Sequence, residues 1–435
     1  MKPESVSTKQ ERIAKLAAES PAMAFTSLNH YLDAEWLRYA YECTRKDGAV
    51  GVDGQTGQEY AAHLEQNLQS LMDRLKSGRY RAPPVRRHYI DKSDGGKRAL
   101  GIPSFEDKVA QRAIVMLLEP IYEQAFLNCS FGFRTGRNAH QALRVLRHGI
   151  VGQGARWVLE VDVRKYFDSI DHAKLRELLD RRVTDGVVRR MIDKWLKAGV
   201  LEEGRLSFPG VGTPQGGVIS PMLANVFLHY VLDEWLAEQV QPRLRGSSAL
   251  IRYCDDFVML FAYKDDAERV QAVLGKRLAK FGLELHPDKT RLIDFRPPAE
   301  RVSAETTLPT TFTFLGFLHA WSQPRKGKAA TVWQRTAKDR LARTLKAINQ
   351  QCRRMRSWPI ADQQRRLSRM LEGHFAYFGI TGNYQRLASV VHWTRRIWRK
   401  WLSRRSWKSY VTWEQFLRLV ARYPLPVARI VHRYS

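Results

Sequence analysis

The tetrapeptide Tyr253-Cys254-Asp255-Asp256 places two adjacent carboxylates between two apolar runs, residues 249–251 before it and residues 257–261 after it. Two strand-forming segments joined by a short polar turn predict a β-hairpin. Burying ionised carboxylates without a partner is costly, and a divalent cation removes that cost. Mg²⁺ prefers oxygen ligands and is commonly held by one or two carboxylates together with substrate phosphates. The turn is therefore predicted to be half of a metal site, whereas the alternative is an Asp pair in a solvated hairpin turn.

A third carboxylate of interest, Asp162, ends the nearly continuous apolar run 157–163, which predicts a buried central strand. A carboxylate that leaves a buried strand is unusual unless it is paired or metal-bound. Asp162 is thus the natural third ligand for Asp255 and Asp256 if the two strands are neighbours. The alternative is an Asp that caps the next turn. Asp168 and Asp171 are better candidates for caps, because Asp171 opens a helix predicted over residues 172–180.

Two cationic residues flank a predicted hairpin turn at residues 94–96, between strand-forming segments that begin at Val85 and end near Pro103. Lys92 and Arg98 come from opposite strands, so they could hold a triphosphate between them. The alternative is an ordinary solvated hairpin. Ser104 then caps a helix predicted to run to Leu118.

Two further stretches could approach a ligand. Arg134 and Arg137 lie in a loop or short strand, where they could meet phosphates or a template backbone. Gly216 and Gly217 follow Gln215 and precede an amphipathic helix predicted over residues 222–239. The double glycine would let a ligand or a base pair lie against the backbone.

The charge of the chain indicates a polyanionic partner. Its 435 residues carry a formal net charge of +28, and nucleic acid is the best match to that excess. Residues 325–435 hold 26 Lys and Arg against 4 Asp and Glu, so most of the excess lies in the last quarter. A Pro- and Gly-containing basic linker at residues 322–328 predicts a boundary there.

The remaining composition indicates an intracellular globular chain. Apolar residues make up 44% of it, which suits two to three domains with real cores. Its four cysteines are far apart and form no CxxC pair, which fits a reducing cytosol. The polar N-terminus lacks the apolar core of a signal peptide, and no apolar run approaches membrane-spanning length.

The basic C-terminal segment combines cations with tryptophan. Trp393, Ile397 and Trp401 recur at four-residue spacing on a predicted helix, and basic residues occupy its other faces. We expect the tryptophans to face inward and the cations to face phosphate. The basic residues are Arg395, Arg396, Arg399, Lys400, Arg404 and Arg405.

Seven blocks in this order resemble the bacterial group II intron reverse transcriptase/maturase family over roughly residues 25–430. No single block would be specific, but the ordered set is. The tail, with Gly379-Ile-Thr-Gly-Asn383-Tyr and the Trp/Arg helix, resembles the thumb or maturase region of that family. The seven blocks are Arg98-Ala-Leu-Gly-Ile-Pro, Ser130-Phe-Gly-Phe-Arg, Val161-Asp-Val-Arg-Lys-Tyr-Phe-Asp, Pro214-Gln-Gly-Gly-Val-Ile-Ser-Pro, Tyr253-Cys-Asp-Asp, Gly282-Leu-Glu-Leu-His-Pro-Asp-Lys-Thr and Phe314-Leu-Gly-Phe.

The resemblance implies an α+β right-hand polymerase, with fingers and a ferredoxin-like palm, followed by an all-α thumb or maturase domain. The expected boundaries are an N-terminal extension at 1–24, fingers at 25–150, palm at 151–322, and a helical thumb with a basic nucleic-acid-binding region at 323–435.

The resemblance also implies roles for individual residues. Asp162, Asp255 and Asp256, with the Val163 carbonyl nearby, would hold two Mg²⁺ ions, for which Mn²⁺ could substitute. Lys92 and Arg98 would bind the incoming triphosphate, and Gln215 would lie by the nascent base pair. Phe167 resembles the steric gate that rejects a 2′-hydroxyl, and Lys289 would lie near the leaving pyrophosphate.

The implied activity is RNA-directed DNA synthesis by two-metal nucleotidyl transfer, together with binding of intron RNA for splicing. Cys254 stands where intron-encoded members more often carry Ala, which blurs the subfamily. The sequence shows no Cys-rich or His-Asn-His nuclease module, so we expect any intron mobility to use a pre-existing primer. The expected partners are an RNA template and intron RNA, a DNA primer and target DNA, and deoxynucleoside triphosphates. We expect a cytoplasmic monomer or homodimer.

Three other functions fit part of the sequence. A domesticated relative could use the same chemistry in DNA repair or phage defence. A splicing factor could bind RNA without catalysis, which the concentrated positive charge would support. A metal-dependent nuclease would also explain three Asp residues, but it would not explain Lys92 with Arg98, the double-glycine loop or Phe167.

Overall fold

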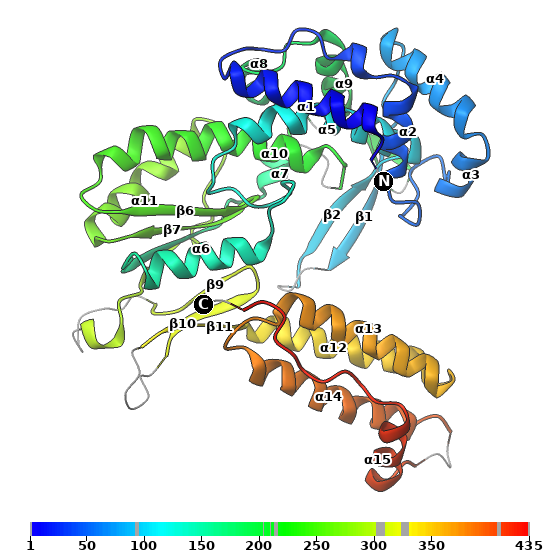
Figure 1. Ribbon diagram of the computed structural model, residues 1–435, viewed down its shortest axis with the longest axis vertical. Helices are drawn as coiled ribbons and strands as arrows, with labels where there is room; N and C mark the ends of the chain where they lie inside the picture. The colour runs from blue at the N-terminus through cyan, green and yellow to red at the C-terminus, as the bar shows by residue number, and fades with distance from the viewer. Residues whose placement is uncertain are drawn as a thin grey trace. The chain divides into compact units, whose positions relative to one another are not determined.

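The computed structural model describes residues 2–91, 95–202, 204–208, 210–212, 216–301, 309–322, 330–406 and 410–433. It is a mixed α/β structure with a helical C-terminal region (Figure 1). The chain divides into two compact units, Met1–Ala142 with Leu159–Arg291, and Leu143–Val158 with Leu292–Ser435. The basic linker predicted at residues 322–328 lies almost entirely outside the described residues, so the predicted domain boundaries stay predictions.

The first unit begins with helices that pack around one long buried helix, α5 (Phe105–Ala125). Ser104 caps α5 as predicted, because its side chain accepts a hydrogen bond from the Asp107 backbone N–H. The Trp36 indole donates to the Ala113 carbonyl at 3.0 Å and ties α2 to α5. The surrounding helices are α1 (Glu4–Glu19), α2 (Ala34–Glu42), α3 (Gly57–Ala62) and α4 (Leu64–Lys76), with a short 3₁₀ turn at Asn29–Tyr31.

A four-stranded sheet in this unit has the order β2-β1-β4-β5. The predicted hairpin is confirmed, since β1 (Val85–Asp91) and β2 (Lys97–Ile102) pair antiparallel. The strands β4 (Val200–Glu202) and β5 (Arg205–Ser207) follow the helices α8 (His172–Asp180) and α9 (Gly186–Leu196). The Asp171 side chain caps α8 as predicted, by accepting from the Lys174 backbone N–H at 2.8 Å.

The central sheet has the order β6-β7-β3-β8. The predicted hairpin of β6 (Ser248–Tyr253) and β7 (Asp256–Phe261) is confirmed, and β3 (Trp157–Val161) lies beside β7. The strand that ends before Asp162 is therefore a neighbour of the strand that begins at Asp256, which is the condition on which the prediction of Asp162 as a third ligand depended. The fourth strand is β8 (Arg291–Asp294), and the division between the two compact units falls within β3 and β8.

The helix predicted over residues 222–239 is more complex than expected. Helix α10 (Ser220–Leu228) continues into two π-helical segments, His229–Asp233 and Leu236–Val240, and then a 3₁₀ turn at Gln241–Arg243. Short π segments are rare and accommodate one additional residue per turn. This unit also contains α7 (Tyr166–Ser169) and α11 (Lys264–Ala279), which ends before Gly282 at φ +79°.

The second unit contains a three-stranded antiparallel sheet, the later part of helix α6 (Ala139–Val151) and a helical bundle. The strands β9 (Phe312–Phe314), β10 (Phe317–Trp321) and β11 (Val332–Thr336) have the order β11-β10-β9. A short 3₁₀ turn covers Pro298–Glu300. The bundle helices are α12 (Lys338–Arg354), α13 (Ile360–Phe378), α14 (Tyr384–Leu402) and α15 (Trp413–Arg422).

The tryptophans of α14 differ from the prediction. Trp398 is the fully buried one, and its indole donates to Gln363 of α13 at 2.8 Å. Trp393 is 45% exposed and Trp401 is half-buried. The prediction was wrong for Trp393, because the buried stripe of the helix excludes it, whereas Trp401 packs against the core of the bundle. The buried stripe consists of Leu387, Val390, Val391, Thr394, Trp398 and Leu402. None of the helices in the described part of the chain combines the length and apolarity that a membrane span requires.

Candidate active site

The turn of the β6–β7 hairpin presents the first two carboxylates. Tyr253 pairs with Asp256 across the end of the hairpin, so Cys254 and Asp255 form a two-residue turn. Cys254 is buried and adopts φ +60°. A left-handed conformation at a residue other than Gly, Asn or Asp costs roughly 1–3 kcal/mol and persists only where the surroundings hold it. The turn is therefore a strained element that its neighbours must keep in place.

The charges of Asp162 and Arg98 act on Asp255 in this turn. Burial raises the pKa of Asp255, the Arg98 guanidinium opposes that rise, and the negative charge of Asp162 adds to it. Asp162 follows β3 directly, whereas Arg98 lies on β2 and is exposed. The fold thus brings two predicted acids and one predicted triphosphate-binding cation, from three separate blocks of the sequence, within range of each other's charge.

The segment after α11 packs against the Asp162 region. The His286 backbone N–H donates to the Asp162 carbonyl at 2.8 Å, and Val163 forms an antiparallel bridge with Leu285. The Lys289 ammonium lies 3.3 Å from the Asp162 carboxylate. Lys289, predicted to lie near the leaving pyrophosphate, thus sits beside the first predicted metal ligand.

The chemistry of these carboxylates suits a divalent cation, although they do not form a closed site by themselves. Within the described ranges of the chain, no three His, Cys, Asp or Glu side chains lie close enough together to form a ready-made metal site. However, Asp162 and Asp255 repel each other, Asp255 is half-buried, and Asp256 is exposed at the first residue of β7. Hard oxygen donors in this number fit Mg²⁺, which completes its octahedron with water and substrate phosphates. The residues present therefore fit the predicted ion.

Of the other predicted nucleotide contacts, Phe167 lies in the described part of the chain. Phe167 lies in α7 and is half-buried, with its ring centre 5.3 Å from that of Tyr166. The Tyr166 hydroxyl donates to the Ala224 carbonyl of α10 at 2.7 Å, which fixes the short helix that carries Phe167. Lys92 and Gln215 lie outside the described residues, so their predicted roles stay predictions.

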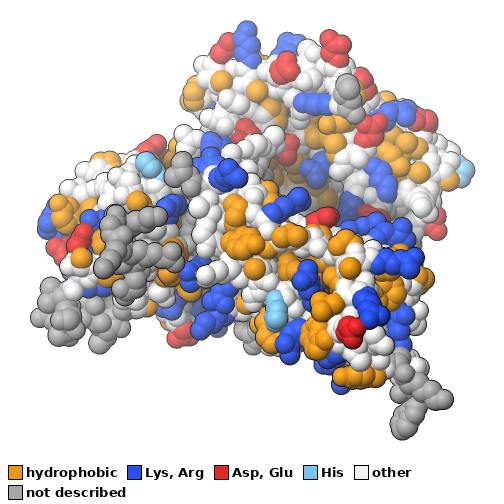
Figure 2. Space-filling view, turned by 60° about the horizontal axis from the view of Figure 1, so that its bottom comes forward, with side chains coloured by type: hydrophobic (Ala, Val, Ile, Leu, Met, Phe, Trp, Pro, Cys, Tyr) orange, Lys and Arg blue, Asp and Glu red, His pale blue; other side chains and the backbone are white. Residues whose placement is uncertain are grey.

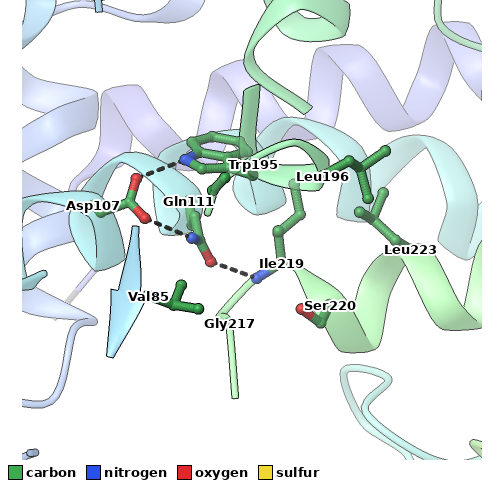
Figure 3. Close-up of a pocket in the computed structure, with 10 residues that line it drawn as sticks. Val85, Asp107, Gln111, Trp195, Leu196, Gly217, Ile219, Ser220 and Leu223 are labelled. Carbon is green, nitrogen blue, oxygen red and sulfur yellow. Dashed lines mark hydrogen bonds between the residues drawn. The ribbon is translucent and has the colours of Figure 1, made fainter. Parts of the chain in front are cut away.

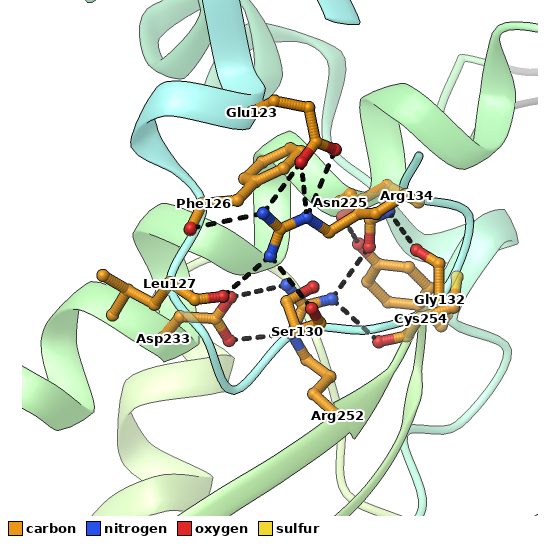
Figure 4. Close-up of polar contacts among 12 residues, drawn as sticks. Glu123, Phe126, Leu127, Ser130, Gly132, Arg134, Asn225, Asp233, Arg252 and Cys254 are labelled. Carbon is orange, nitrogen blue, oxygen red and sulfur yellow. Dashed lines mark hydrogen bonds and ion pairs between the residues drawn. The ribbon is translucent and has the colours of Figure 1, made fainter. Parts of the chain in front are cut away.

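A buried polar network that the sequence reasoning missed lies directly behind the turn (Figure 4). The Arg252 and Asp233 side chains are both fully buried and form a two-pronged ion pair, with N–O distances of 2.7 and 2.5 Å. Arg252 also donates to the Asn225 side chain at 2.9 Å and to the Cys254 carbonyl at 3.0 Å. The available clue was an arginine in a strand that is otherwise apolar, because such a residue needs a buried partner.

The contacts of Arg134 differ from its predicted role at phosphate. The side chain is buried, and its guanidinium bonds the Glu123 carboxylate and the carbonyls of Leu127 and Ser130 (Figure 4). These bonds hold the loop that follows α5 and occupy the guanidinium, so Arg134 supports the fold and is not placed to contact nucleic acid. Arg137 is half-buried and donates to the Asn128 side chain at 2.6 Å.

A second polar cluster anchors the segment that follows the double glycine (Figure 3). Asp107 of α5 accepts hydrogen bonds from Tyr80, from the Trp195 indole and from the Gln111 amide. The oxygen of the same Gln111 amide accepts from the Ile219 backbone N–H at 3.2 Å. The cavity that Asp107, Gln111, Trp195 and Ile219 line has a volume of only about 10 Å³. The cluster is therefore a tightly packed support for residues 216–219 and offers no room for a substrate.

The basic residues of α14 lie largely at the surface of the second unit, close to aromatic side chains. Figure 2 shows Lys and Arg side chains interspersed with hydrophobic side chains on one face of the molecule. We call Trp393, Arg396, Arg399 and Trp413 the basic–aromatic patch. The Arg396 guanidinium lies 5.4 Å from the Trp393 ring centre, and that of Arg399 lies 4.2 Å from the Trp413 ring centre. Arg395, Arg396, Lys400, Arg404 and Arg405 are exposed, whereas Arg399 is half-buried. Such a surface can stack bases and neutralise phosphates.

Comparisons with known proteins identify relatives of the chain. The family model described as reverse transcriptase (RNA-dependent DNA polymerase) matches residues 90–319. Protein YkfC of Escherichia coli strain K12 is 33% identical over 323 residues, which cover 66% of this chain and 84% of YkfC. The group II intron-encoded protein LtrA of Lactococcus lactis subsp. cremoris is 35% identical over 285 residues, 65% of this chain. The match covers 47% of LtrA, so it spans about half the length of that relative.

A more distant relative is the nuclear intron maturase 4, mitochondrial, of Arabidopsis thaliana. It is 28% identical over 195 residues, which cover 45% of this chain and 23% of the maturase.

Proposed function

This chain belongs to the group II intron reverse transcriptase/maturase family, and we propose that it extends a DNA primer on an RNA template by adding deoxynucleotides. One observation carries the proposal: the charges of Asp162, which follows β3, and of Arg98, on β2, both act on Asp255 in the β6–β7 turn. A nucleotidyl transfer site needs carboxylates for the metal ions beside cations for the triphosphate. The site thus combines both requirements at one strained turn.

We further propose that the parts of the chain have polymerase roles. Residues 25–150 would act as fingers, residues 151–322 as palm and residues 323–435 as a thumb or maturase domain, after an extension at 1–24. The β1–β2 hairpin carries Arg98 and the central sheet carries the acids, which supports this division. The bundle of α12 to α15 with its basic surface supports a role in gripping nucleic acid.

Each residue of the site would have a distinct task. Arg98, with Lys92, would bind the triphosphate oxygens and orient the α-phosphorus toward the primer 3′-hydroxyl. Lys289, beside Asp162, would stabilise negative charge on the departing pyrophosphate. Phe167, on the helix that Tyr166 fixes, would occupy the space of a 2′-hydroxyl and so select deoxynucleotides. Gln215 would lie by the nascent base pair.

The acids would hold the divalent ions of this reaction. Asp162, Asp255 and Asp256, with the Val163 carbonyl, are the proposed ligands. When bound, two Mg²⁺ or Mn²⁺ ions would supply activation of the primer hydroxyl and neutralisation of the triphosphate charge. The protein contributes the placement of these oxygens, and the burial that raises the pKa of Asp255 makes a bound cation favourable there.

Primer extension by the Asp255→Ala variant tests the proposal. We expect the rate on a poly(rA)/oligo(dT) substrate to fall by at least about 10²-fold, because the variant loses a carboxylate at which transition-state charge is stabilised. The matched control is Asp265→Ala, which removes an exposed Asp whose partner is Arg245. We expect this control to extend at the parent rate. Equal rates for Asp255→Ala and the parent would end the proposal.

A maturase role is the second candidate, and the concentration of charge in residues 325–435 favours it. We propose that this basic surface binds intron RNA, so that binding and catalysis use different parts of the chain. Splicing of a cognate intron RNA by the Asp255→Ala protein separates the two activities, since a maturase would retain splicing without polymerisation.

The remaining alternative is a domesticated relative in repair or defence. The DNA flanking the gene decides it, because an intron-encoded protein lies within a foldable group II intron.

A further inference from the structure

Arg252 lies in a strand whose neighbours are apolar, yet its guanidinium is fully buried and serves three partners. One edge forms the ion pair with Asp233. The remaining nitrogen donates both to the Asn225 side chain and to the Cys254 carbonyl. The planar fork of an arginine spreads its donors over three nitrogens and so reaches such divergent partners at once, whereas a lysine carries its three donors on a single nitrogen. The side chain therefore links the catalytic turn to the α10 helix and its π-helical continuation.

We propose that Arg252 is a positioning residue that holds the Cys254–Asp255 peptide in its strained conformation, with Asp233 and Asn225 as its anchors. The inference rests on the proposed function and deepens it, because the peptide that Arg252 fixes carries Asp255. Stability alone does not explain the pair, since a well-packed apolar pair of similar volume is often at least as stable. The hydrogen bond to the Cys254 carbonyl is the feature that an apolar pair would lack.

The π-helical segment His229–Asp233 supplies one anchor. A π turn changes which of the following side chains face the sheet, and it places Asp233 against Arg252 with no exposed surface. π segments inside helices occur frequently at functional sites. The π-helical segment after α10 thus presents Asp233 to Arg252 of β6.

Asn225 supplies the second anchor and extends the support to the other side of the turn. Its amide nitrogen donates to the Gly132 carbonyl at 2.7 Å, while its oxygen accepts from Arg252. The backbone of β6 joins the same loop, because the Phe131 N–H donates to the Arg252 carbonyl and the Arg252 N–H donates to the Cys129 carbonyl, both at 2.8 Å. The turn is therefore clamped between residues 129–132 and α10.

The position of this clamp bears directly on the chemistry. Cys254 at φ +60° is a conformation that a free hairpin would leave readily, because it is strained in a non-glycine residue. The donor on the Cys254 carbonyl fixes the plane of the peptide that enters Asp255. Loss of that donor would let the turn relax and move the Asp255 carboxylate. A displacement of about 1 Å at a reacting centre can cost about 10²-fold in rate.

The double variant Arg252→Met with Asp233→Leu tests the inference, because it replaces both buried charges with apolar side chains and removes the bond to Cys254. We expect it to fold and to bind a preformed primer–template duplex with the parent Kd. We also expect kcat for single-nucleotide addition to fall by about 10²-fold with little change in KM for the nucleotide. Binding of Mn²⁺ to the protein alone, followed by electron paramagnetic resonance, should weaken as well.

The matched control is Arg74→Met with Glu106→Leu, which replaces a half-buried ion pair that makes no contact with the turn. It should leave kcat and Mn²⁺ binding at parent values. If the first double variant does not fold, the Arg252→Lys variant tests the positioning role instead. Its lysine keeps a positive charge beside Asp233 but loses the planar fork that donates to Asn225 and to the Cys254 carbonyl. Its kcat should then fall with the Kd for the duplex unchanged.

Parent values of kcat and Mn²⁺ binding in a folded Arg252 variant would overturn the positioning role. A parent protein that fails to extend a primer would instead refute the proposed function, so the two failures are distinguishable.

Discussion

Gly132 packs so closely against the Cys254–Asp255 turn that a single methyl group should disturb it. A Cβ added at Gly132 would lie 2.6 Å from the Cys254 backbone nitrogen and 2.9 Å from the Tyr253 carbonyl carbon. Ordinary contact begins at 3.4 Å, so the two segments must separate by about 0.8 Å in the Gly132→Ala variant. Both neighbours are backbone atoms that cannot rotate away. The strain must therefore shift either the turn or the loop that holds it.

The magnitude of the effect follows from this geometry. Overpacking of this kind costs typically about 1–3 kcal/mol, which a domain of ordinary stability survives. A shift of nearly 1 Å at the Asp255 carboxylate should lower kcat by roughly 10²-fold. The variant should thus remain folded and bind its duplex, yet incorporate nucleotides slowly.

Single-turnover nucleotide addition on a preformed RNA–DNA duplex measures the effect, with thermal unfolding as the check on folding. The matched control is Gly373→Ala in α13, where an added Cβ meets nothing within 4 Å. This control should keep full activity and gain up to about 1 kcal/mol of stability, as Gly-to-Ala changes in exposed helices do. A folded Gly132→Ala protein with parent kcat would refute the reasoning about the turn.

Three further predictions concern the supports and the surface. Burial raises the pKa of Asp107 to about 6 from 3.8, so the folded state favours the protonated form. The protein should therefore lose about 3 kcal/mol of unfolding free energy as pH rises from about 4 through 6. Denaturation at a series of pH values should show this loss in the parent and its absence in Asp107→Asn. Trp398→Ala should lower the unfolding free energy by about 3–5 kcal/mol and Trp393→Ala by under about 0.5 kcal/mol, and similar losses in denaturant melts would contradict the burial of Trp398. Arg134→Gln should destabilise the fold by roughly 3 kcal/mol and leave the salt dependence of RNA binding intact. Arg395→Gln should not affect stability, but it should lower the slope of the logarithm of the RNA-binding constant against the logarithm of salt concentration by about 0.7–0.9.

The local parts of the site were predictable from the sequence because each depends on a short pattern. Two apolar runs around a polar turn predicted the β6–β7 hairpin, and the structure confirms it. Ser104 and Asp171 were predictable caps, since an N-cap needs only a side-chain acceptor before a helical stretch. The placement of Asp162 at the end of a central strand also followed from an apolar run.

Contacts between distant segments were beyond these patterns. Arg134 has the sequence context of an exposed loop cation, but it is buried because Glu123 and two carbonyls converge on it from the end of α5. Trp393 shares a spacing with other apolar residues, but the stripe that the bundle covers contains Trp398. Local periodicity shows that a helix has an apolar face, and only its neighbours decide which of two candidate faces is covered.

The sequence by itself determined the acids, the cations and the hairpins that carry them, because hydrophobic period and turn chemistry act over a few residues. Only the tertiary structure decided that β3 lies beside β7, that Arg98 acts on Asp255, and that Asp233 meets Arg252 behind the turn. These pairings depend on strand order and on a π-helical irregularity in the chain after α10. Both arise from how separate segments pack, and no short stretch of the sequence encodes them alone.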